Sequence, residues 1–254
     1  MKNISLKKIL KRGRALYLAY DQGLEHGPSD FNDINVDPRR IIKIAADGKF
    51  NAVVFQKGII EKYHQEIRAS KVQLIIKLNG KTNLSQGEPI SRQLCSVKEA
   101  VALKGVAVGY TIYVGSEHET EMMTEFERIE HEAHEAGLPV IAWVYPRGKG
   151  IRNRTSRELL AYATRVGLEL GADIVKVNWN GNQNDLRWAV KAAGKTKVVV
   201  AGGIKSDEKT FLKNVHTIME TGACGLAVGR NIWQHKQPLE LTRKIRKIIF
   251  DTAN

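Results

Sequence analysis

The chain has 254 residues, of which 43% are hydrophobic, so it holds enough apolar material for a sizeable core in one or two domains. Forty basic residues against 27 acidic ones give a formal net charge of +13, which favours anionic partners such as nucleic acid or phosphorylated metabolites. The basic residues are densest near the two ends of the chain, where we interpret them as solvated helical faces, and no recognised nucleic-acid motif is found.

Two cysteines, Cys95 and Cys224, are too few for a disulfide framework. The apolar run that follows the basic start, Ala15 to Tyr20, is too short for a signal-peptide core or a membrane span. We therefore expect a soluble cytoplasmic protein whose partners are neither membranes nor nucleic acid.

Short runs rich in β-branched residues alternate with longer amphipathic segments along the whole chain. Near-continuous apolar runs are typical of parallel strands that are covered on both faces, so each run predicts such a strand. The eight runs are Ala15–Tyr20, Ala52–Gln56, Val72–Leu78, Val106–Thr111, Pro139–Val144, Asp173–Asn178, Lys197–Ala201 and Cys224–Val228.

Helical patterns lie between these runs, most clearly at Thr124–Ala136, Ser156–Leu170 and Glu208–Thr221. Thr155 and Glu158 have the spacing of a capping box at the start of the second helix, and Gly171 is placed to end it.

Eight strand–helix units without a Pro/Gly/Ser-rich linker predict an α/β protein with a single (β/α)8 TIM barrel, formed as one domain by residues 1–254. A doubly wound open sheet is the alternative, but eight units in a chain of this length favour closure. The segment Asn79–Ser96 is long for a strand–helix loop, and loops of that length are often functional.

A lysine, Lys176, stands inside the apolar run Asp173–Asn178. Burying an ammonium is costly, and burial lowers the pKa of a lysine until its neutral amine can attack a carbonyl and form a Schiff base. The alternative is a lysine at a strand end whose charged group reaches water.

Polar residues stand at the C-terminal ends of the predicted strands, where barrel enzymes carry their active sites. Tyr145 is the candidate general acid/base, and Asp21 is placed to hold substrate hydroxyls or to assist proton exchange. The alternatives are a buried tyrosine with one satisfied hydroxyl and an aspartate that stabilises a turn. The other polar or aromatic residues at these ends are Gln56, Lys57, Lys77, Asn79, Tyr110, Thr111 and Trp143.

Glycine turns follow the last two predicted strands. Gly202 and Gly203 follow the seventh strand, and Gly229 with Arg230 follows the eighth. Glycines let backbone N–H groups approach phosphate oxygens, and an arginine adds charge-assisted hydrogen bonds, so the pair of turns predicts a phosphate site. Two ordinary glycine turns are the alternative.

No metal-ligand cluster is evident in the sequence. His131 and His134 flank Glu132 with the wrong spacing for the zinc motif HExxH, and we place both histidines on a solvated helix face. We therefore expect neither a metal nor another cofactor.

Several motifs, in the same order along the chain, together resemble the archaeal-type class I fructose-1,6-bisphosphate aldolases. The resemblance runs from about Gly13 to Gln234 and rests on Tyr20–Pro28, Lys77–Thr82, Val108–Tyr113, Trp143–Gly148, Gly171–Asp173, Lys176, Gly202–Gly203 and Ala227–Gln234.

The resemblance implies a barrel enzyme that cleaves fructose 1,6-bisphosphate to dihydroxyacetone phosphate and glyceraldehyde 3-phosphate, and catalyses the reverse condensation, without a metal. It also implies a homo-oligomer. By position, the resemblance makes Lys176 the Schiff-base lysine and Tyr145 the proton-transfer residue, with Asp21 and Trp143 beside them. It makes Gly202, Gly203, Gly229 and Arg230 the phosphate site. Separately, we expect His26 and Arg147 to bind the substrate, with Arg147 and Lys149 nearer the rim as candidates for the second phosphate.

The sequence departs from the family pattern at Gln22, Asn178–Asn180, Ala201 and Ile204, all on the expected substrate rim. These departures leave the sugar-phosphate preference open. The alternatives are a Schiff-base aldolase or transaldolase acting on another sugar phosphate, a barrel isomerase that uses Lys176 as a base, and a noncatalytic sugar-phosphate binder or basic nucleic-acid partner.

Overall fold

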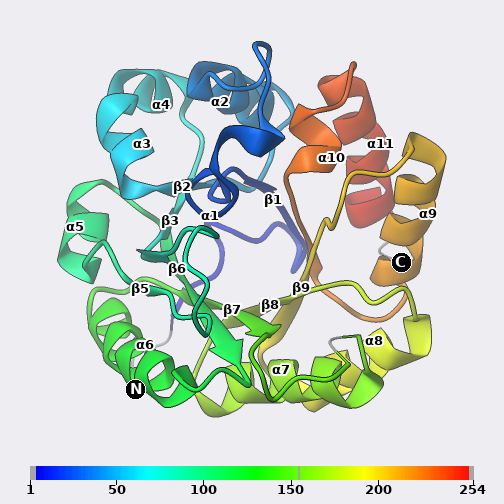
Figure 1. Cartoon of the computed structure of the whole chain (residues 1–254). Coiled ribbons are helices and arrows are strands. Elements are labelled where there is room, and N and C mark those ends of the chain that lie inside the picture. Colours follow the sequence, from blue (N-terminus) through cyan, green and yellow to red (C-terminus); the bar gives the residue numbers. More distant parts are fainter. Residues whose placement is uncertain (1–3, 154, 252–254) are drawn as a thin grey trace.

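A computed structural model describes residues 4–153 and 155–251. Within these residues, eight parallel strands close into a barrel in the order β1-β10-β9-β8-β7-β6-β3-β2, with helices around the outside (Figure 1). The strands are β1 (Ala15–Ala19), β2 (Ala52–Gln56), β3 (Leu74–Lys77), β6 (Ala107–Val114), β7 (Val140–Pro146), β8 (Ile174–Val177), β9 (Lys197–Ala201) and β10 (Gly225–Val228). The predicted (β/α)8 barrel is confirmed. Each of the eight predicted runs overlaps a barrel strand, although β6 and β7 extend beyond the predicted ends to Val114 and Pro146.

The helices cover the outer face of the barrel (Figure 1). The longer ones are α2 (Pro38–Asp47), α6 (Glu119–Glu135), α7 (Arg157–Glu169), α8 (Gln183–Ala192), α9 (Glu208–Met219) and α11 (Pro238–Asp251). The shorter ones are α1 (Gly23–His26), α3 (Lys57–Lys62), α4 (His64–Ser70), α5 (Val97–Ala102) and α10 (Arg230–Trp233), with a 3-10 turn at Gly27–Asp30. None of the helices in the described part of the chain has the length and apolarity needed to cross a membrane.

Alternation along each strand produces two apolar clusters. On β1, Leu16 and Leu18 belong to the large cluster shared with the surrounding helices, whereas Ala15 and Tyr17 belong to a second cluster that also contains Val54 and Ile75. A packed core of this kind inside the barrel leaves the polar groups to the C-terminal ends of the strands.

The long segment after β3 forms a small hairpin. Strands β4 (Asn79–Gly80) and β5 (Arg92–Gln93) pair antiparallel. The hairpin places Ser91 and Asn79 against β6, because the Asn79 side chain donates to the carbonyls of Ser91 and Thr111, both at 2.8 Å.

The predicted capping box at the start of α7 was wrong by one residue. Ser156, not Thr155, accepts the hydrogen bond that caps the helix, from the backbone N–H of Leu159 at 3.2 Å. The amide and hydroxyl of Thr155 donate instead to Asn153 Oδ1, at 3.1 and 3.0 Å, within the preceding turn.

Candidate active site

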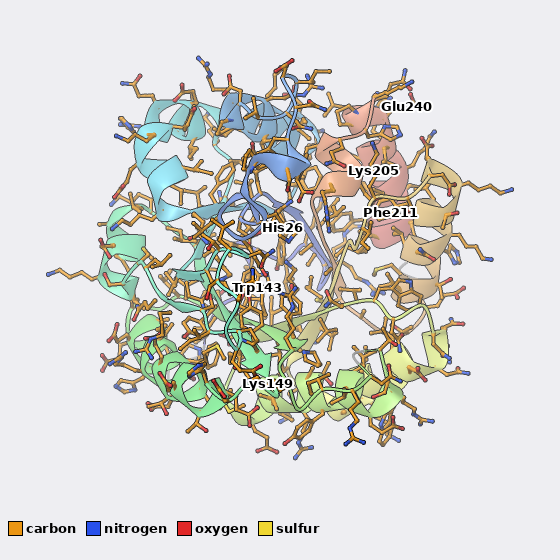
Figure 2. All side chains as sticks on the ribbon, viewed as in Figure 1. His26, Trp143, Lys149, Lys205, Phe211 and Glu240 are labelled. Carbon is orange, nitrogen blue, oxygen red and sulfur yellow. The ribbon has the colours of Figure 1, made fainter. Side chains whose placement is uncertain are left out.

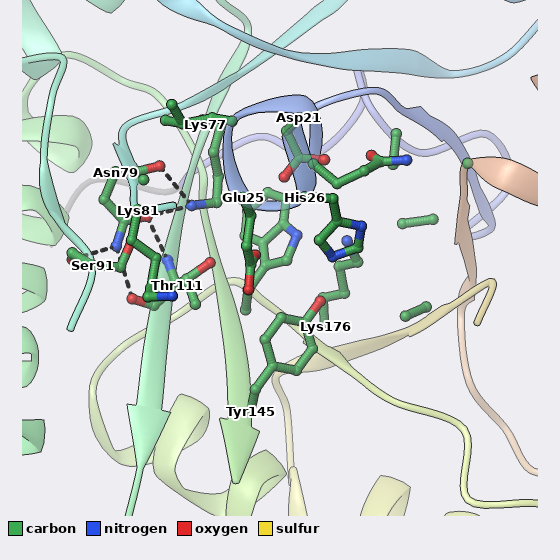
Figure 3. Close-up of a pocket in the computed structure, with 18 of the residues that line it drawn as sticks. Asp21, Glu25, His26, Lys77, Asn79, Lys81, Ser91, Thr111, Tyr145 and Lys176 are labelled. Atoms are coloured by element: carbon green, nitrogen blue, oxygen red, sulfur yellow. Dashed lines mark hydrogen bonds between the residues drawn. The ribbon is translucent and has the colours of Figure 1, made fainter. Parts of the chain in front are cut away.

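One polar pocket lies at the C-terminal ends of the barrel strands (Figure 3). All ten residues predicted for catalysis or substrate binding line it: Asp21, His26, Trp143, Tyr145, Arg147, Lys176, Gly202, Gly203, Gly229 and Arg230. Among the further lining residues are Gln22, Glu25, Gln56, Lys77, Asn79, Lys81, Ser91, Thr111 and Tyr113. The topology thus brings together residues that are more than 200 positions apart in the sequence.

Lys176 enters the pocket from β8, where the strand register sets it beside Trp143 on β7 and Val199 on β9. Its side chain is buried, and Nζ lies 5.0 Å from the centre of the Trp143 ring. Burial lowers the pKa of Lys176, and the negative charges of Asp21 and Glu25 oppose this effect. The net lowering favours the free amine, which is the nucleophilic form.

The Trp143 ring fills the space between β7 and its neighbour β6. Gly109 on β6 permits this position, because a Cβ there would lie only 1.8 and 2.0 Å from two atoms of the ring and would overlap them. The indole Nε1 is buried and has no hydrogen-bond partner within the described residues. An unpartnered buried donor is unusual in a folded protein and is available to a bound ligand.

Tyr145 lies two residues beyond Trp143, so its side chain points to the same side of β7. Figure 3 shows the Tyr145, Lys176 and Asp21 side chains in the same pocket. Burial raises the pKa of Tyr145 well above its usual value; Asp21 and Glu25 raise it further, and Arg147 opposes them. The phenol is therefore protonated in the free protein and starts as a proton donor.

The turns after β9 and β10 are held together by Asn231, which the sequence analysis did not single out. The buried Asn231 amide donates to the carbonyls of Gly202 and Ile204, at 2.9 and 3.1 Å, and its Oδ1 accepts from Ser206 N–H at 3.0 Å. Gly203 adopts a φ of +71°, which favours glycine. At Gly202, the backbone N–H donates to the Ala227 carbonyl at 2.9 Å, so this amide is not available to a phosphate.

Arg230 begins α10 and faces the pocket beside Gly229. Its Nη1 lies 3.6 Å from Asp30 Oδ1, and the other oxygen of Asp30 lies 2.7 Å from His26 Nδ1. The predicted substrate contacts His26 and Arg230 are therefore both oriented by the same carboxylate.

Arg147, predicted to contact the second phosphate, already has a carboxylate partner. Its Nη1 lies 2.6 Å from Glu25 Oε1, and this oxygen also accepts from the Tyr113 hydroxyl at 3.2 Å. The guanidinium stacks over the rings of Tyr113 and Tyr145, at 5.2 and 5.8 Å. Although burial raises the pKa of Glu25, the charge and hydrogen bond of Arg147 outweigh this and lower it overall.

Two predicted positions differ from the structure. Lys149 is exposed and lies outside the pocket, farther out than Trp143 and His26 (Figure 2), with its amide on the carboxylate of Glu88. Tyr110 lies in the middle of β6 rather than at its end, because the strand continues to Val114. Its hydroxyl donates to Glu125 on α6 at 2.6 Å, so the side chain faces the helix layer.

The helical histidines have separate environments. The side chain of His131 is 69% exposed, as predicted, but the prediction was wrong for His134, which lies 2.8 Å from Glu130 and 2.9 Å from Asp173. Over the residues that the structure describes, no group of three or more His, Cys, Asp or Glu side chains is arranged to hold a metal ion.

Comparison with known proteins gives a consistent result. Residues 15–235 match the family described as DeoC/LacD family aldolase. The chain is 47% identical to the class 1 fructose-bisphosphate aldolase of Thermoproteus tenax, over 96% of this chain and 93% of the relative. It is 41% identical to the Halobacterium salinarum protein of the same name, over 97% of this chain and 94% of the relative. An archaeal fructose-1,6-bisphosphate aldolase, solved with its catalytic lysine covalently bound to the carbinolamine intermediate, superimposes with a TM-score of 0.92 at 47% identity, covering 96% of this chain and 97% of that one.

Proposed function

Since this chain belongs to the DeoC/LacD family of aldolases, we propose that it is a class I fructose-1,6-bisphosphate aldolase that works through a lysine Schiff base. It cleaves fructose 1,6-bisphosphate to dihydroxyacetone phosphate and glyceraldehyde 3-phosphate and catalyses the reverse condensation. The observation that carries the proposal is the buried Lys176 amine, which lies over the Trp143 ring in a pocket shared with Asp21 and Tyr145.

In this mechanism the neutral amine of Lys176 attacks the C2 ketone of the open-chain sugar and forms a carbinolamine. Tyr145 gives its proton to the departing hydroxyl, which leaves as water, so an iminium and a phenolate result. The phenolate then removes the proton of the C4 hydroxyl while the C3–C4 electron pair moves into the iminium. This step releases the aldehyde and leaves an enamine on Lys176.

The second half of the reaction returns the protein to its starting state. Tyr145 protonates the enamine at C3, and water adds to the resulting iminium with loss of a proton to the phenolate. Collapse of this carbinolamine releases dihydroxyacetone phosphate and the free amine. Asp21 holds substrate hydroxyls and assists the carbinolamine steps, since its charge acts on both Lys176 and Tyr145.

The phosphate next to the ketone is assigned to the turns that carry Gly202, Gly203, Gly229 and Arg230. The close packing of these turns supports the assignment, because a Cβ at Gly202 would lie 2.8 Å from Val228 and one at Gly229 would lie 2.8 Å from the Ala19 carbonyl. We assign the second phosphate to Arg147, with His26 as a further contact. Binding of the phosphates, away from the bond that breaks, positions the reacting carbon. This positioning lowers the entropic part of the activation barrier.

The test is trapping with sodium borohydride and dihydroxyacetone phosphate in the presence of EDTA, read by intact mass and peptide mapping. We expect an irreversible mass gain on the wild-type peptide that contains Lys176, and no adduct in Lys176→Met. The wild-type protein should also cleave fructose 1,6-bisphosphate in the same EDTA buffer. If dihydroxyacetone phosphate binds by calorimetry but leaves no adduct, the Schiff-base mechanism is wrong and an isomerase or a sugar-phosphate binder takes its place.

We also propose a homo-oligomer of single-domain subunits in the cytoplasm. Two large side chains on neighbouring helices support an interface, because Tyr162 on α7 is 61% exposed and Trp188 on α8 is 43% exposed. Two unpaired cysteines suit a reducing compartment. Multi-angle light scattering of the wild type and of a Tyr162→Glu, Trp188→Glu double variant tests this interface, and a wild-type monomer would contradict the oligomer.

A further inference from the structure

A cavity of about 580 Å³ lies at the N-terminal ends of three barrel strands, on the side of the barrel opposite to the candidate active site. Its lining residues Arg14 and Cys224 directly precede β1 and β10, and Lys197 begins β9. These three strands are neighbours in the barrel. A strand rises by about 3.3 Å per residue, so the five residues of β1 alone separate its two ends by roughly 15 Å. The cavity and the active-site pocket accordingly share no lining residue.

Three cationic side chains line this cavity, and no carboxylate lines it among the residues that the structure describes. Lys195 and Lys197 are exposed, and neither side chain has a hydrogen bond or an ion pair to residues 4–153 or 155–251. The half-buried Arg14 is oriented by a hydrogen bond from Nη1 to the Ala223 carbonyl at 3.0 Å. A guanidinium has five N–H donors, so this bond leaves others for a ligand.

Two of the positive charges converge on the buried end of the cavity, where Cys224 is only 5% exposed. Burial raises the pKa of the Cys224 thiol to about 12, and the charges of Lys197 and Arg14 oppose this rise. Both cations are therefore close enough to act on the same buried atom. Like charges that converge without a counter-ion repel each other, and an anion with more than one charge between them removes that repulsion.

The turns around the cavity add backbone donors. Gly13 and Lys195 line it, and in the described part of the chain neither backbone N–H has an acceptor. Gly13 has a φ of +73°, and a Cβ there would meet no atom within 4 Å, so this backbone is open to a ligand. A phosphate monoester carries about −1.5 to −2 charges at pH 7 and three strong acceptor oxygens, whereas a carboxylate carries one charge. The donors and charges of the cavity thus match a phosphoryl group best.

We propose that this cavity is a second anion site, which binds the phosphoryl group of a small molecule between Arg14, Lys195 and Lys197. Its volume is within the range of small-molecule sites, so the favoured ligand is a phosphorylated metabolite rather than the free phosphate ion. The site is separate from the proposed aldolase chemistry. It lies on β1, β9 and β10, the strands whose other ends carry Asp21 and the two glycine turns, so its ligand contacts elements that hold the active site without entering it.

The test is calorimetric titration with adenosine monophosphate, which has no ketone that could react with Lys176, at low ionic strength. The Lys195→Met, Lys197→Met double variant is compared with Lys62→Met, Lys98→Met, which removes the same two charges from exposed positions on α3 and α5 outside both cavities. The active site is intact in both variants, so any difference between them reports the cavity. Two charge-assisted contacts are lost in the first variant, so we expect it to bind at least about tenfold more weakly than the second.

Equal affinities of the two double variants would overturn the proposal, because net charge or the active site would then account for the binding. A parallel titration with inorganic phosphate separates the two sources of the phosphoryl group. Tighter binding of adenosine monophosphate supports a metabolite, and equal binding of the two probes would overturn that choice.

Thermal melting shows whether the Lys195→Met, Lys197→Met variant folds. A test that needs no variant is to soak wild-type crystals in tungstate, a phosphate analogue that is located by its anomalous scattering. Tungstate beside Arg14 and Lys197 supports the site, and a cavity without tungstate would overturn it.

Discussion

The position of the Trp143 ring gives the sharpest steric prediction. A Cβ built on Gly109 would overlap Cζ3 and Cη2 of that ring and would lie 3.0 Å from Cε3. Ordinary carbon–carbon contacts lie at about 3.5–4.0 Å, so in Gly109→Ala the ring must retreat by about 1.5 Å or more. The ring lies inside the barrel with the Lys176 amine 5.0 Å from its centre, so a shift of the ring also disturbs Lys176.

Overpacking of a core costs about 1–3 kcal/mol, and we expect Gly109→Ala at the upper end, about 3 kcal/mol. For a domain of this size that corresponds to a fall in Tm of roughly 6–12 °C. Displacement of catalytic groups by ~1 Å costs on the order of 100-fold in rate, so kcat should fall by about that factor.

The matched control is Gly58→Ala. Gly58 is exposed within α3, and a Cβ there meets no atom within 4 Å. Alanine is favoured over glycine inside a helix by about 0.5–1 kcal/mol, so this variant should melt slightly above the wild type and keep its kcat. The two variants are compared by thermal melting and by initial rates of fructose 1,6-bisphosphate cleavage. If Gly109→Ala melts within about 2 °C of the wild type at full kcat, the ring is not packed against β6 as described.

Three further predictions concern other parts of the site. Asn231→Ala leaves two carbonyls and one N–H in the phosphate turns without partners. Its free energy of unfolding, measured by chemical denaturation, should therefore fall by about 2–3 kcal/mol, and KM for the sugar phosphate should rise by more than about tenfold. An unchanged KM would contradict the phosphate assignment. Glu25→Gln should lower Tm at pH 7, because Arg147 opposes the effect of burial and the pKa of Glu25 is lowered overall in the folded state. The ionised carboxylate stabilises the fold above its ordinary pKa of 4.5, and this contribution is lost as the pH falls through the lower folded value, so the Tm values of the variant and the wild type should converge at acid pH. Burial raises the pKa of Cys95 to about 11 and of Cys224 to about 12, so iodoacetamide at about pH 8 should label neither thiol in the native protein and both in guanidinium, as read by mass spectrometry.

The sequence predicts the barrel because parallel strands covered on both faces give continuous apolar runs. Because these runs are continuous, they do not indicate at which residue a strand ends. The run through β6 is apolar or β-branched from Ala107 to Val114, so its pattern ends at no particular residue. Since side chains alternate, the face of each one follows only from pairing, and β7 pairs with β6 as far as Val114. Tyr110 consequently faces Glu125 in the helix layer, while Thr111 and Tyr113 line the pocket.

Residues at the site were predictable where strand position alone decides exposure to the pocket, as for Lys176 and Tyr145. Interactions between distant segments were not. The ion pair of Glu25 with Arg147 joins residues 122 positions apart, and nothing local to either residue indicates it. Asn231 was likewise part of a quoted motif, but its role depends on the turn after β9, some 27 positions earlier. For the helix α7, adjacent Thr155 and Ser156 can both cap, and only the turn at Asn153 selects between them.

The net charge of the chain likewise does not indicate which charged side chains act in the pocket. The value of +13 fits a phosphorylated substrate, but part of it comes from surface side chains remote from the pocket, such as Lys11, Arg12 and Arg243. Inside the pocket, five lysine and arginine side chains face two carboxylates. Arg147 is neutralised by Glu25 and Arg230 lies near Asp30, so the incoming phosphates must compete with these carboxylates for both arginines. This competition makes substrate binding an exchange of partners rather than simple neutralisation.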